Sequence, residues 1–287
     1  MKTNGTVVFQ SDFGLVDGAV SAMFGVANAV SPKLQLYNLT HEIPQFDIWE
    51  ASYRLIQTVE YWAPGTVFVS VVDPGVGTDR KSVAVLTESG HYIVTPDNGT
   101  LTHVAQMIGI TRRHEIEEAV NRLEDSQNSY TFHGRDVYAY TGARLAAGVI
   151  DLDGVGRSLP PQETVVYPSE PAKLGKGVIE ASVDILDSRY GSLWTNCPQD
   201  LFAELGVIHG DYVSVRISHH GRNVYGNDLK FGKSFSDVNV GASIVYVNSL
   251  LNMGVAINQG NFARAHDVGA GTDWRISFRK TPAGPGR

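Results

Sequence analysis

The sequence predicts an α/β protein with a mostly parallel N-terminal sheet flanked by helices, followed by a smaller C-terminal antiparallel β-barrel. Strand-like and helix-like stretches alternate over the first half of the chain, as they do in mostly parallel sheets covered by helices. After Gly175 the pattern changes to short strand-like runs separated by Gly, Asn and Asp, which is typical of small antiparallel barrels. A length of 287 residues is large for one core and favours two domains.

The elements of the first half follow from hydrophobic periodicity. They are strand 6–10, helix 18–30, strand 35–39, helix 46–62, strands 67–72, 82–86 and 92–96, a short helical stretch 100–107 and helix 135–148. Prolines at 160, 161, 168 and 171 then exclude a helix or a long strand. We therefore expect an N-terminal domain at 1–160, a linker at 161–174 and a C-terminal domain at 175–287.

The C-terminal domain is expected to be built from short strands. They are 177–186, 212–218, 233–235, 242–248, 254–258 and 274–278, with one short helix at 200–205. The tail 281–287 contains two prolines and two glycines and is expected to fray.

Composition limits the classes of partner and the cellular setting. The net charge is −7, from 23 basic and 30 acidic residues, which argues against binding a nucleic-acid backbone and favours a small or cationic ligand. The single cysteine, Cys197, excludes an internal disulfide and is expected to be a packing residue. The chain has neither a signal-like start nor an apolar run of about 20 residues, so we expect a cytoplasmic protein without membrane contact.

One polar cluster is expected where a buried strand ends. Asp73 follows the strand at 67–72, and in open α/β sheets this edge is where ligands bind. Pro74 and Gly75 begin a tight loop that returns Arg80 toward Asp73. The alternative is a turn-forming Asp in a surface ion pair of little energetic worth.

A second polar group is expected at the start of the helix at 135–148. His133 precedes it, with Asp136 three residues on, and both could simply cap the helix and complement its dipole. Combined with Asp73 and Arg80, however, His133 completes a set of acid, base and fixed cation without metal-ligand spacing. Such a set suits activation of a water molecule, with no metal and no cofactor.

Six motifs in order make the chain resemble the S-adenosyl-L-methionine (SAM) hydroxide adenosyltransferases, the adenosine-forming SAM hydrolases related to fluorinase and chlorinase. The resemblance spans nearly the whole chain. The motifs are Ser11–Gly14, Val72–Gly77 with Arg80, Pro96–Gly99, Phe132–Asp136, Asp187 with Tyr190–Gly191 and Trp194–Asn196, and Asn248–Ser249 followed by Ala256–Asn261.

The resemblance implies hydrolysis of SAM to adenosine and methionine by a homotrimer whose active sites lie between neighbouring subunits. It assigns positioning and activation of the water to Asp73, Arg80 and His133, and it leaves open whether Asp73 or His133 accepts the proton. In the fluorinase branch a serine occupies the position of Gly134, and the aspartate matching Asp73 is absent. The chain therefore resembles the branch that uses hydroxide.

The same resemblance assigns the substrate contacts. Asp12 would accept the ribose hydroxyls, Phe46 would face the sugar and sulfonium, and Ser249 would contact the carboxylate. Asp17 and Asp187 would lie near the methionine moiety, and Ser192 with the backbone near Ile257 and Gln259 would face adenine. Tyr190 is a further substrate-binding position. Two positions depart from the family pattern: Ser192 replaces an asparagine, and Leu250 replaces the arginine that fluorinase has after the serine.

Three other functions compete with hydrolysis. A halogenase would use the same substrate and require halide, a sensor would bind SAM or adenosine without turnover, and a nucleotide hydrolase would require a metal.

Overall fold

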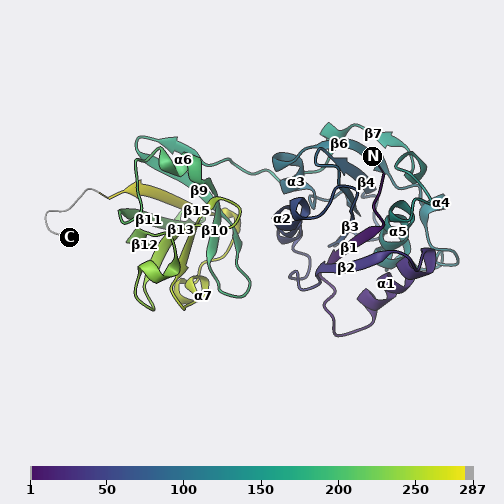
Figure 1. Cartoon of the computed structure of the whole chain (residues 1–287), viewed down its shortest axis with the longest axis horizontal. Helices are drawn as coiled ribbons and strands as arrows, with labels where there is room; N and C mark the ends of the chain where they lie inside the picture. The colour runs from purple at the N-terminus through teal and green to yellow at the C-terminus, as the bar shows by residue number, and fades with distance from the viewer. Residues whose placement is uncertain (1, 282–287) are drawn as a thin grey trace. The chain divides into compact units, whose positions relative to one another are not determined.

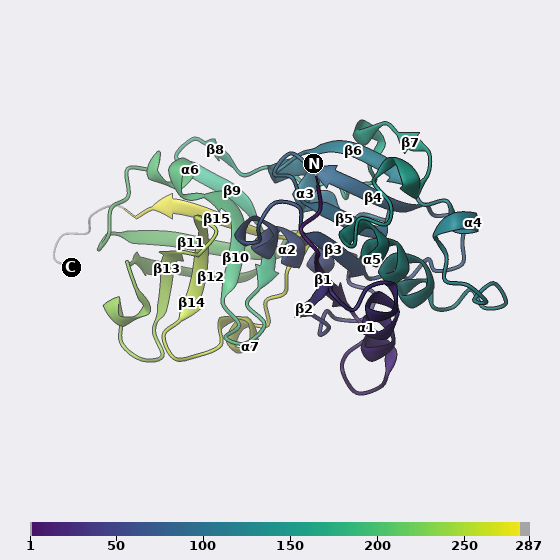
Figure 2. The same cartoon turned by 45° about the vertical axis from the view of Figure 1, so that its right-hand side comes forward.

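The computed structural model describes residues 2–281, so most of the tail expected to fray, 282–287, lies outside the described residues. The chain divides into two compact units between Tyr167 and Pro168, within the segment 161–174 expected to be a linker. Figures 1 and 2 show helices gathered in the first unit and strands dominating the second. Among the helices of the described residues, none combines the length and the apolar character that crossing a membrane requires.

The first unit contains a seven-stranded sheet in the order β2-β1-β3-β5-β4-β6-β7 among its described residues. Pairing is parallel from β2 to β5, and β4, β6 and β7 extend the sheet with antiparallel pairs. The strands are β1 (Thr6–Ser11), β2 (Gln35–Thr40), β3 (Val67–Val71), β4 (Ser82–Thr87), β5 (Tyr92–Pro96), β6 (Ile110–Glu115) and β7 (Ser158–Leu159).

Helices cover both faces of this sheet because the central strands are apolar on both sides. Phe9 and Val69 pack with α1 and α5, whereas Val8 and Phe68 pack with α2 and α3, as is usual for buried parallel strands. The helices are α1 (Ala19–Val30), α2 (Ile48–Thr58) with a 3₁₀ turn at Val59–Tyr61, α3 (Thr102–Met107), α4 (Glu118–Asn121) and α5 (Tyr140–Ala146), preceded by a π-helical turn, η2 (Gly134–Ala139). The predicted α/β class is confirmed.

The second unit is a β-barrel. Pairing of β9 with β10 closes the strands β9 to β15 into a ring, and β8 adds outside β9. All pairs are antiparallel except β12 with β13. The elements are β8 (Lys173–Gly175), β9 (Val178–Leu186), β10 (Leu193–Pro198), α6 (Gln199–Ala203), β11 (Tyr212–His219), β12 (Arg222–Phe231), β13 (Ser243–Val247), β14 (Asn252–Ile257), α7 (Phe262–His266) and β15 (Gly271–Lys280).

One predicted strand of the barrel is wrong. Residues 233–235 do not form a strand, because Ser234 and Asp237 form a capping box around a 3₁₀ turn at Phe235–Asp237. The strand in this region is β12, whose many polar residues conceal it in the sequence, and only its inward-facing side chains such as Tyr225 and Leu229 are buried. The sequence analysis also missed β6, β10, α4 and α7. Cys197 packs in the barrel core as expected, where burial raises the pKa of its thiol to about 12.

A buried ion pair ties the segment after β7 to the sheet. The Arg113 guanidinium pairs with the Asp97 carboxylate, and both side chains are almost fully buried. Arg113 Nη1 also donates to the Pro160 carbonyl (3.1 Å), and Asp97 Oδ1 accepts from the Val165 backbone N–H (3.0 Å). The pair therefore holds both sides of the 3₁₀ turn at Pro161–Glu163.

We expect Arg113→Met to lower the free energy of unfolding by roughly 3 to 5 kcal/mol, because it leaves the Asp97 carboxylate buried without its cation. Arg112→Met is the matched control, since its partner Asp153 is exposed, and it should change stability by at most about 0.5 kcal/mol. Urea unfolding of both variants measures this. Equal losses would show that the buried pair has no special role.

Candidate active site

The Asp73–Arg80 pair lies just beyond the end of β3, as the sequence predicts. The loop between them is turned by the Asp73 carbonyl, which accepts from the Val76 N–H (3.2 Å). Arg80 then contacts both carboxylate oxygens, with Nε 2.9 Å from Oδ1 and Nη2 2.5 Å from Oδ2. The side chains are only 12% and 5% exposed. This bidentate and sheltered pair is not the exposed ion pair that the alternative interpretation requires.

His133 joins the pair through Arg80. Arg80 Nη2 lies 3.0 Å from His133 Nδ1, and because a guanidinium only donates, Nδ1 must be the acceptor and the ring proton resides on Nε2. Burial lowers the pKa of His133, and the charges of Arg80 and Arg122 lower it further against the opposing carboxylates of Glu118 and Asp73. His133 is therefore a neutral ring whose Nδ1 lone pair is already occupied.

Arg80 remains a cation in this site. Burial alone would lower its pKa, but the hydrogen bond and charge of Asp73 outweigh burial and the pKa is raised. The pair therefore presents a fixed positive charge beside a carboxylate.

These groups border a cavity of about 540 Å³ in the first unit. Five of the predicted site residues line it, and Arg80 lies behind Asp73. The lining comprises Asp12, Phe13, Asp17, Ala19, Gln45, Phe46, Val71, Asp73, Val76, Thr131, Phe132, His133 and Gly134. Asp12 and Asp17 add carboxylates to a lining that also contains apolar side chains, so the cavity suits a ligand that combines apolar surface with positive charge.

Asp12 is held in the cavity by the backbone of Phe46. The Phe46 N–H donates to Asp12 Oδ2 at 2.9 Å. Phe46 has a φ of 68°, in the left-handed region that non-glycine residues avoid. The residue is 66% exposed. The carboxylate thus stabilises an unfavourable backbone conformation that places an aromatic ring at the cavity.

A buried histidine that the sequence analysis did not use fixes the loop carrying Asp12. His41 Nε2 donates to Asn38 Oδ1 (2.9 Å), so its Nδ1 accepts from the Ser11 hydroxyl (2.7 Å). Ser11 Oγ in turn accepts from the Phe13 N–H (3.3 Å), and the His41 carbonyl accepts from the Gly14 N–H (2.7 Å). Burial lowers the pKa of His41 to about 4, so this neutral relay persists at neutral pH.

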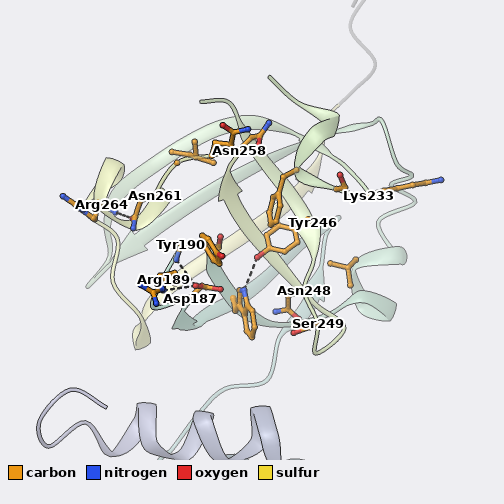
Figure 3. Close-up of a pocket in the computed structure, with 18 residues that line it drawn as sticks. Asp187, Arg189, Tyr190, Lys233, Tyr246, Asn248, Ser249, Asn258, Asn261 and Arg264 are labelled. Carbon is orange, nitrogen blue, oxygen red and sulfur yellow. Dashed lines mark hydrogen bonds between the residues drawn. The ribbon is translucent and has the colours of Figure 1, made fainter. Parts of the chain in front are cut away.

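The predicted residues of the second unit gather around a larger cavity of about 1110 Å³ (Figure 3). Asp187, Tyr190, Ser192, Ser249, Ile257 and Gln259 all line it. Asp187 Oδ1 accepts from the backbone N–H groups of Arg189 (3.0 Å) and Tyr190 (2.9 Å), which makes a tight turn. Gly191 completes this turn at φ 65°, where an added Cβ would lie 2.1 Å from the Asn261 side chain. Any other residue there would be strained and would displace the Asn261 side chain.

Two aromatic residues in this cavity lack a predicted role. The Tyr246 hydroxyl accepts from Trp194 Nε1 at 3.0 Å and is hydrogen-bonded to Ser192. Gly254 pairs with both aromatic residues across neighbouring strands, and an added Cβ would lie 2.8 Å from the Tyr246 ring. Glycine at position 254 leaves room for the Tyr246 ring beside Trp194. Ser192 is thus tied to Tyr246.

Ser249 is displayed by a turn between β13 and β14. Asn248 Oδ1 accepts from the N–H groups of Leu250 (2.9 Å) and Asn252 (3.1 Å). Basic side chains that the sequence analysis did not single out also line the cavity, namely Arg189, Lys233 and Arg264. Lys233 and Arg264 extend away from the centre in Figure 3.

Within residues 2–281, no group of three or more His, Cys, Asp or Glu side chains is arranged to hold a metal ion.

Family models match both units of the chain. Residues 7–156 match the SAM hydroxide adenosyltransferase N-terminal domain, and residues 181–275 match the C-terminal domain of the same family. The chain belongs to the SAM hydroxide adenosyltransferase family. The sequence-based resemblance is therefore confirmed.

Individual relatives place this family member beside both hydrolases and halogenases. A protein of Methanocaldococcus jannaschii named (R)-S-adenosyl-L-methionine hydrolase is 40% identical over 80% of each chain. A fluorinase of Actinopolyspora mzabensis is 25% identical over 94% of this chain and 96% of its own. A crystal structure of an uncharacterized conserved protein from Thermotoga maritima is 32% identical, with a TM-score of 0.87 over 96% of this chain and 100% of that chain.

The His41 relay predicts a pH dependence of stability. In the unfolded chain His41 takes up a proton near pH 6.5, whereas in the folded protein it does so only near pH 4. The unfolded state therefore binds more protons in this window, and the contribution of His41 to stability falls as the pH is lowered from about 6.5 to 4. Urea unfolding of the wild type and His41→Gln should show a constant difference above pH 7 that shrinks below pH 6.5. A difference independent of pH would contradict this.

Proposed function

We propose that this protein hydrolyses SAM to adenosine and L-methionine. The observation that carries the proposal is the Asp73–Arg80–His133 arrangement at the wall of an acidic cavity. Membership in the SAM hydroxide adenosyltransferase family supports it. So does the hydrolase name of the 40% identical relative, which specifies the (R) form of the substrate.

The chemistry needs little more than a positioned nucleophile. Oxygen of a water attacks C5′ of the ribose, the C5′–S bond breaks, and its electron pair neutralises the sulfonium, so methionine leaves uncharged at sulfur. The water gives up one proton, which the protein must accept. The protein also accelerates the reaction by holding the water oxygen in line with the C5′–S bond, at about 3 to 3.5 Å from C5′.

We assign the acceptance of the proton to Asp73. His133 Nδ1 is occupied by a donor from Arg80 and Nε2 carries the proton, so the ring has no free lone pair. Asp73 Oδ1 takes one hydrogen bond, from Arg80 Nε, and can accept another from the water, whereas Oδ2 already takes Arg80 Nη2 and the Tyr138 hydroxyl. In this arrangement Arg80 orients the carboxylate and stabilises developing hydroxide, and His133 holds the guanidinium in place.

The two cavities divide the substrate between them in this proposal. Asp12 and Phe46 take the ribose, and Asp17 favours the positive charge of the substrate. Asp187 pairs with the ammonium and Ser249 binds the carboxylate, without the arginine that Leu250 replaces. Tyr190, Ser192, Ile257 and Gln259 surround adenine.

We further propose a homotrimer in which neighbouring subunits contribute the two cavities of each site. The division of the assigned substrate contacts between two separate units supports this. SAM is then the only small molecule required, with no cofactor and no metal, in a cytoplasmic protein.

The halogenase alternative is disfavoured at Gly134. A Cβ built there lies 3.0 Å from the Phe13 ring and 3.3 Å from the Phe132 ring, and these two rings pack edge to face with centroids 5.7 Å apart. A serine at position 134, as in the fluorinase branch, would require the Phe13 and Phe132 rings to move. The SAM turnover assay distinguishes a sensor and a metal-dependent hydrolase from the proposed enzyme.

Purified protein incubated with SAM should form adenosine and methionine without halide and with a chelator present. We expect turnover of the epimer that the relative's name designates (R), and little of the other epimer. A halogenated nucleoside formed only with chloride or fluoride would assign the chain to the halogenases. Binding by calorimetry without product would indicate a sensor, and inhibition by the chelator would indicate a metal enzyme.

Asp73→Asn should lower kcat by about 10²- to 10⁴-fold because it removes the proton acceptor while keeping the shape of the side chain. The KM for SAM should change little. Asp79→Asn, an exposed position of the same loop, is the matched control and should retain full activity. Wild-type kcat in Asp73→Asn would reject the assignment of the proton acceptor.

The shared site can be tested by complementation between two inactive variants. Co-expressed Asp73→Asn and Asp187→Ala chains should regain activity, because random mixing gives about a quarter of the shared sites one intact half from each chain. Sites built within one chain would show no recovery.

A further inference from the structure

Behind the Asp73–Arg80 pair, two hydroxyl groups close a ring of hydrogen bonds. Arg80 Nη1 lies 2.8 Å from Ser82 Oγ, and Ser82 Oγ lies 3.0 Å from the Tyr138 hydroxyl. The Tyr138 hydroxyl then reaches Asp73 Oδ2 at 3.4 Å. Ser82 and Tyr138 are both buried, and neither belongs to the set that the family resemblance assigns to the reaction.

The direction of every bond in the ring is determined by its two charged members. Asp73 as a carboxylate can only accept, so the Tyr138 hydroxyl donates its one proton to it. The Tyr138 oxygen must then accept from the Ser82 hydroxyl, whose own oxygen accepts from Arg80 Nη1. Burial, together with the charge of Asp73, raises the pKa of Tyr138. The phenol thus stays protonated and remains a donor.

The π-helical turn places Tyr138 in this ring. A π turn bonds residue i to residue i+5, so residues five apart come to lie on the same side, where an α-helix would align residues three or four apart. His133 is the N-cap of the turn η2 (Gly134–Ala139), and Tyr138, five residues further on, lies within it. His133 meets Arg80 Nη2. Tyr138 meets Asp73 Oδ2 directly and Arg80 Nη1 through Ser82. π turns of this kind are frequent at functional sites.

We propose that Tyr138 and Ser82 are positioning residues for water activation: together they hold the Asp73 carboxylate and the Arg80 guanidinium in the orientation that accepts the proton. This inference rests on the proposed hydrolysis of SAM. Neither hydroxyl lines the cavity, so both act through the charged pair rather than on the substrate.

The ring has a specific consequence for the carboxylate. Without the Tyr138 hydroxyl, Asp73 loses a donor that favours its charged form, and Ser82 loses the acceptor for its proton. Arg80 would then be the only remaining contact that fixes the carboxylate. The charged groups of the ring are Asp73 and Arg80. His133 contacts Arg80 Nη2, and the charges of Glu118 and Arg122 act on the His133 ring.

The decisive variant is Tyr138→Phe, with Tyr140→Phe as the matched control on the same helix. Tyr140 stacks under Arg144 and is only half-buried. We expect Tyr138→Phe to lower kcat by about 5- to 20-fold with KM within about twofold, at the low end for one hydrogen bond to a charged group because the Tyr138 hydroxyl lies 3.4 Å from Asp73 Oδ2. The acidic limb of the kcat profile should move to higher pH, whereas Tyr140→Phe should leave kcat and the profile unchanged.

Ser82 provides a second route, should Tyr138→Phe fail to fold. Ser82→Ala should reproduce the loss of kcat and the shift of the acidic limb, and Ser82→Thr, which keeps the hydroxyl, should restore both. The double variant Tyr138→Phe with Ser82→Ala should lose no more kcat than Tyr138→Phe alone, because the two hydroxyls act as one unit.

The outcomes separate this inference from the proposed function. A wild-type protein that forms no adenosine overturns both. An active wild type with Tyr138→Phe and Ser82→Ala at wild-type kcat and an unshifted pH profile overturns the positioning role alone. So does a loss confined to KM or to thermal stability, since that would be a structural effect without bearing on the proton acceptor.

Discussion

The guanidinium of Arg80 is the contact on which the N-terminal cavity depends. Its planar fork meets both oxygens of Asp73, the hydroxyl of Ser82 and the ring of His133 at the same time. These partners come from the end of β3, the start of β4 and the start of the π turn, so one side chain connects three elements. A lysine has three donors on one atom and could not meet partners in these different directions.

The sequence predicted the parts of the site that depend on local patterns. Asp73 could be placed at the sheet edge because an apolar strand precedes it, and the resemblance assigned contacts that line the two cavities. The role of Tyr138 could not be predicted from local patterns. Its position relative to Asp73 depends on a π turn, and the sequence pattern does not indicate one. Tyr246 was missed because its meeting with Trp194 depends on the register of strands distant in sequence.

The fold errors have the same origin. A strand at 233–235 looked plausible from Phe235, but the capping box of Ser234 satisfied the backbone locally and ended the ladder after β12. The polar segment of β6 lacks an apolar strand pattern, yet it pairs with β4, and the charge of its buried Arg113 is neutralised by Asp97. In both segments the secondary structure depends on polar side-chain contacts that the apolar pattern does not reveal.

The hydrogen bond between Asp12 and the Phe46 backbone affects how substitutions at Asp12 should be interpreted. Asp12 Oδ2 already accepts a hydrogen bond from the Phe46 N–H. The ribose hydroxyls must therefore donate to Oδ1, or to Oδ2 alongside the Phe46 N–H. Replacing Asp12 would also release a residue held in a left-handed conformation. A weakened ligand affinity in such a variant would therefore combine the loss of a contact to the ribose with the loss of support for the Phe46 ring.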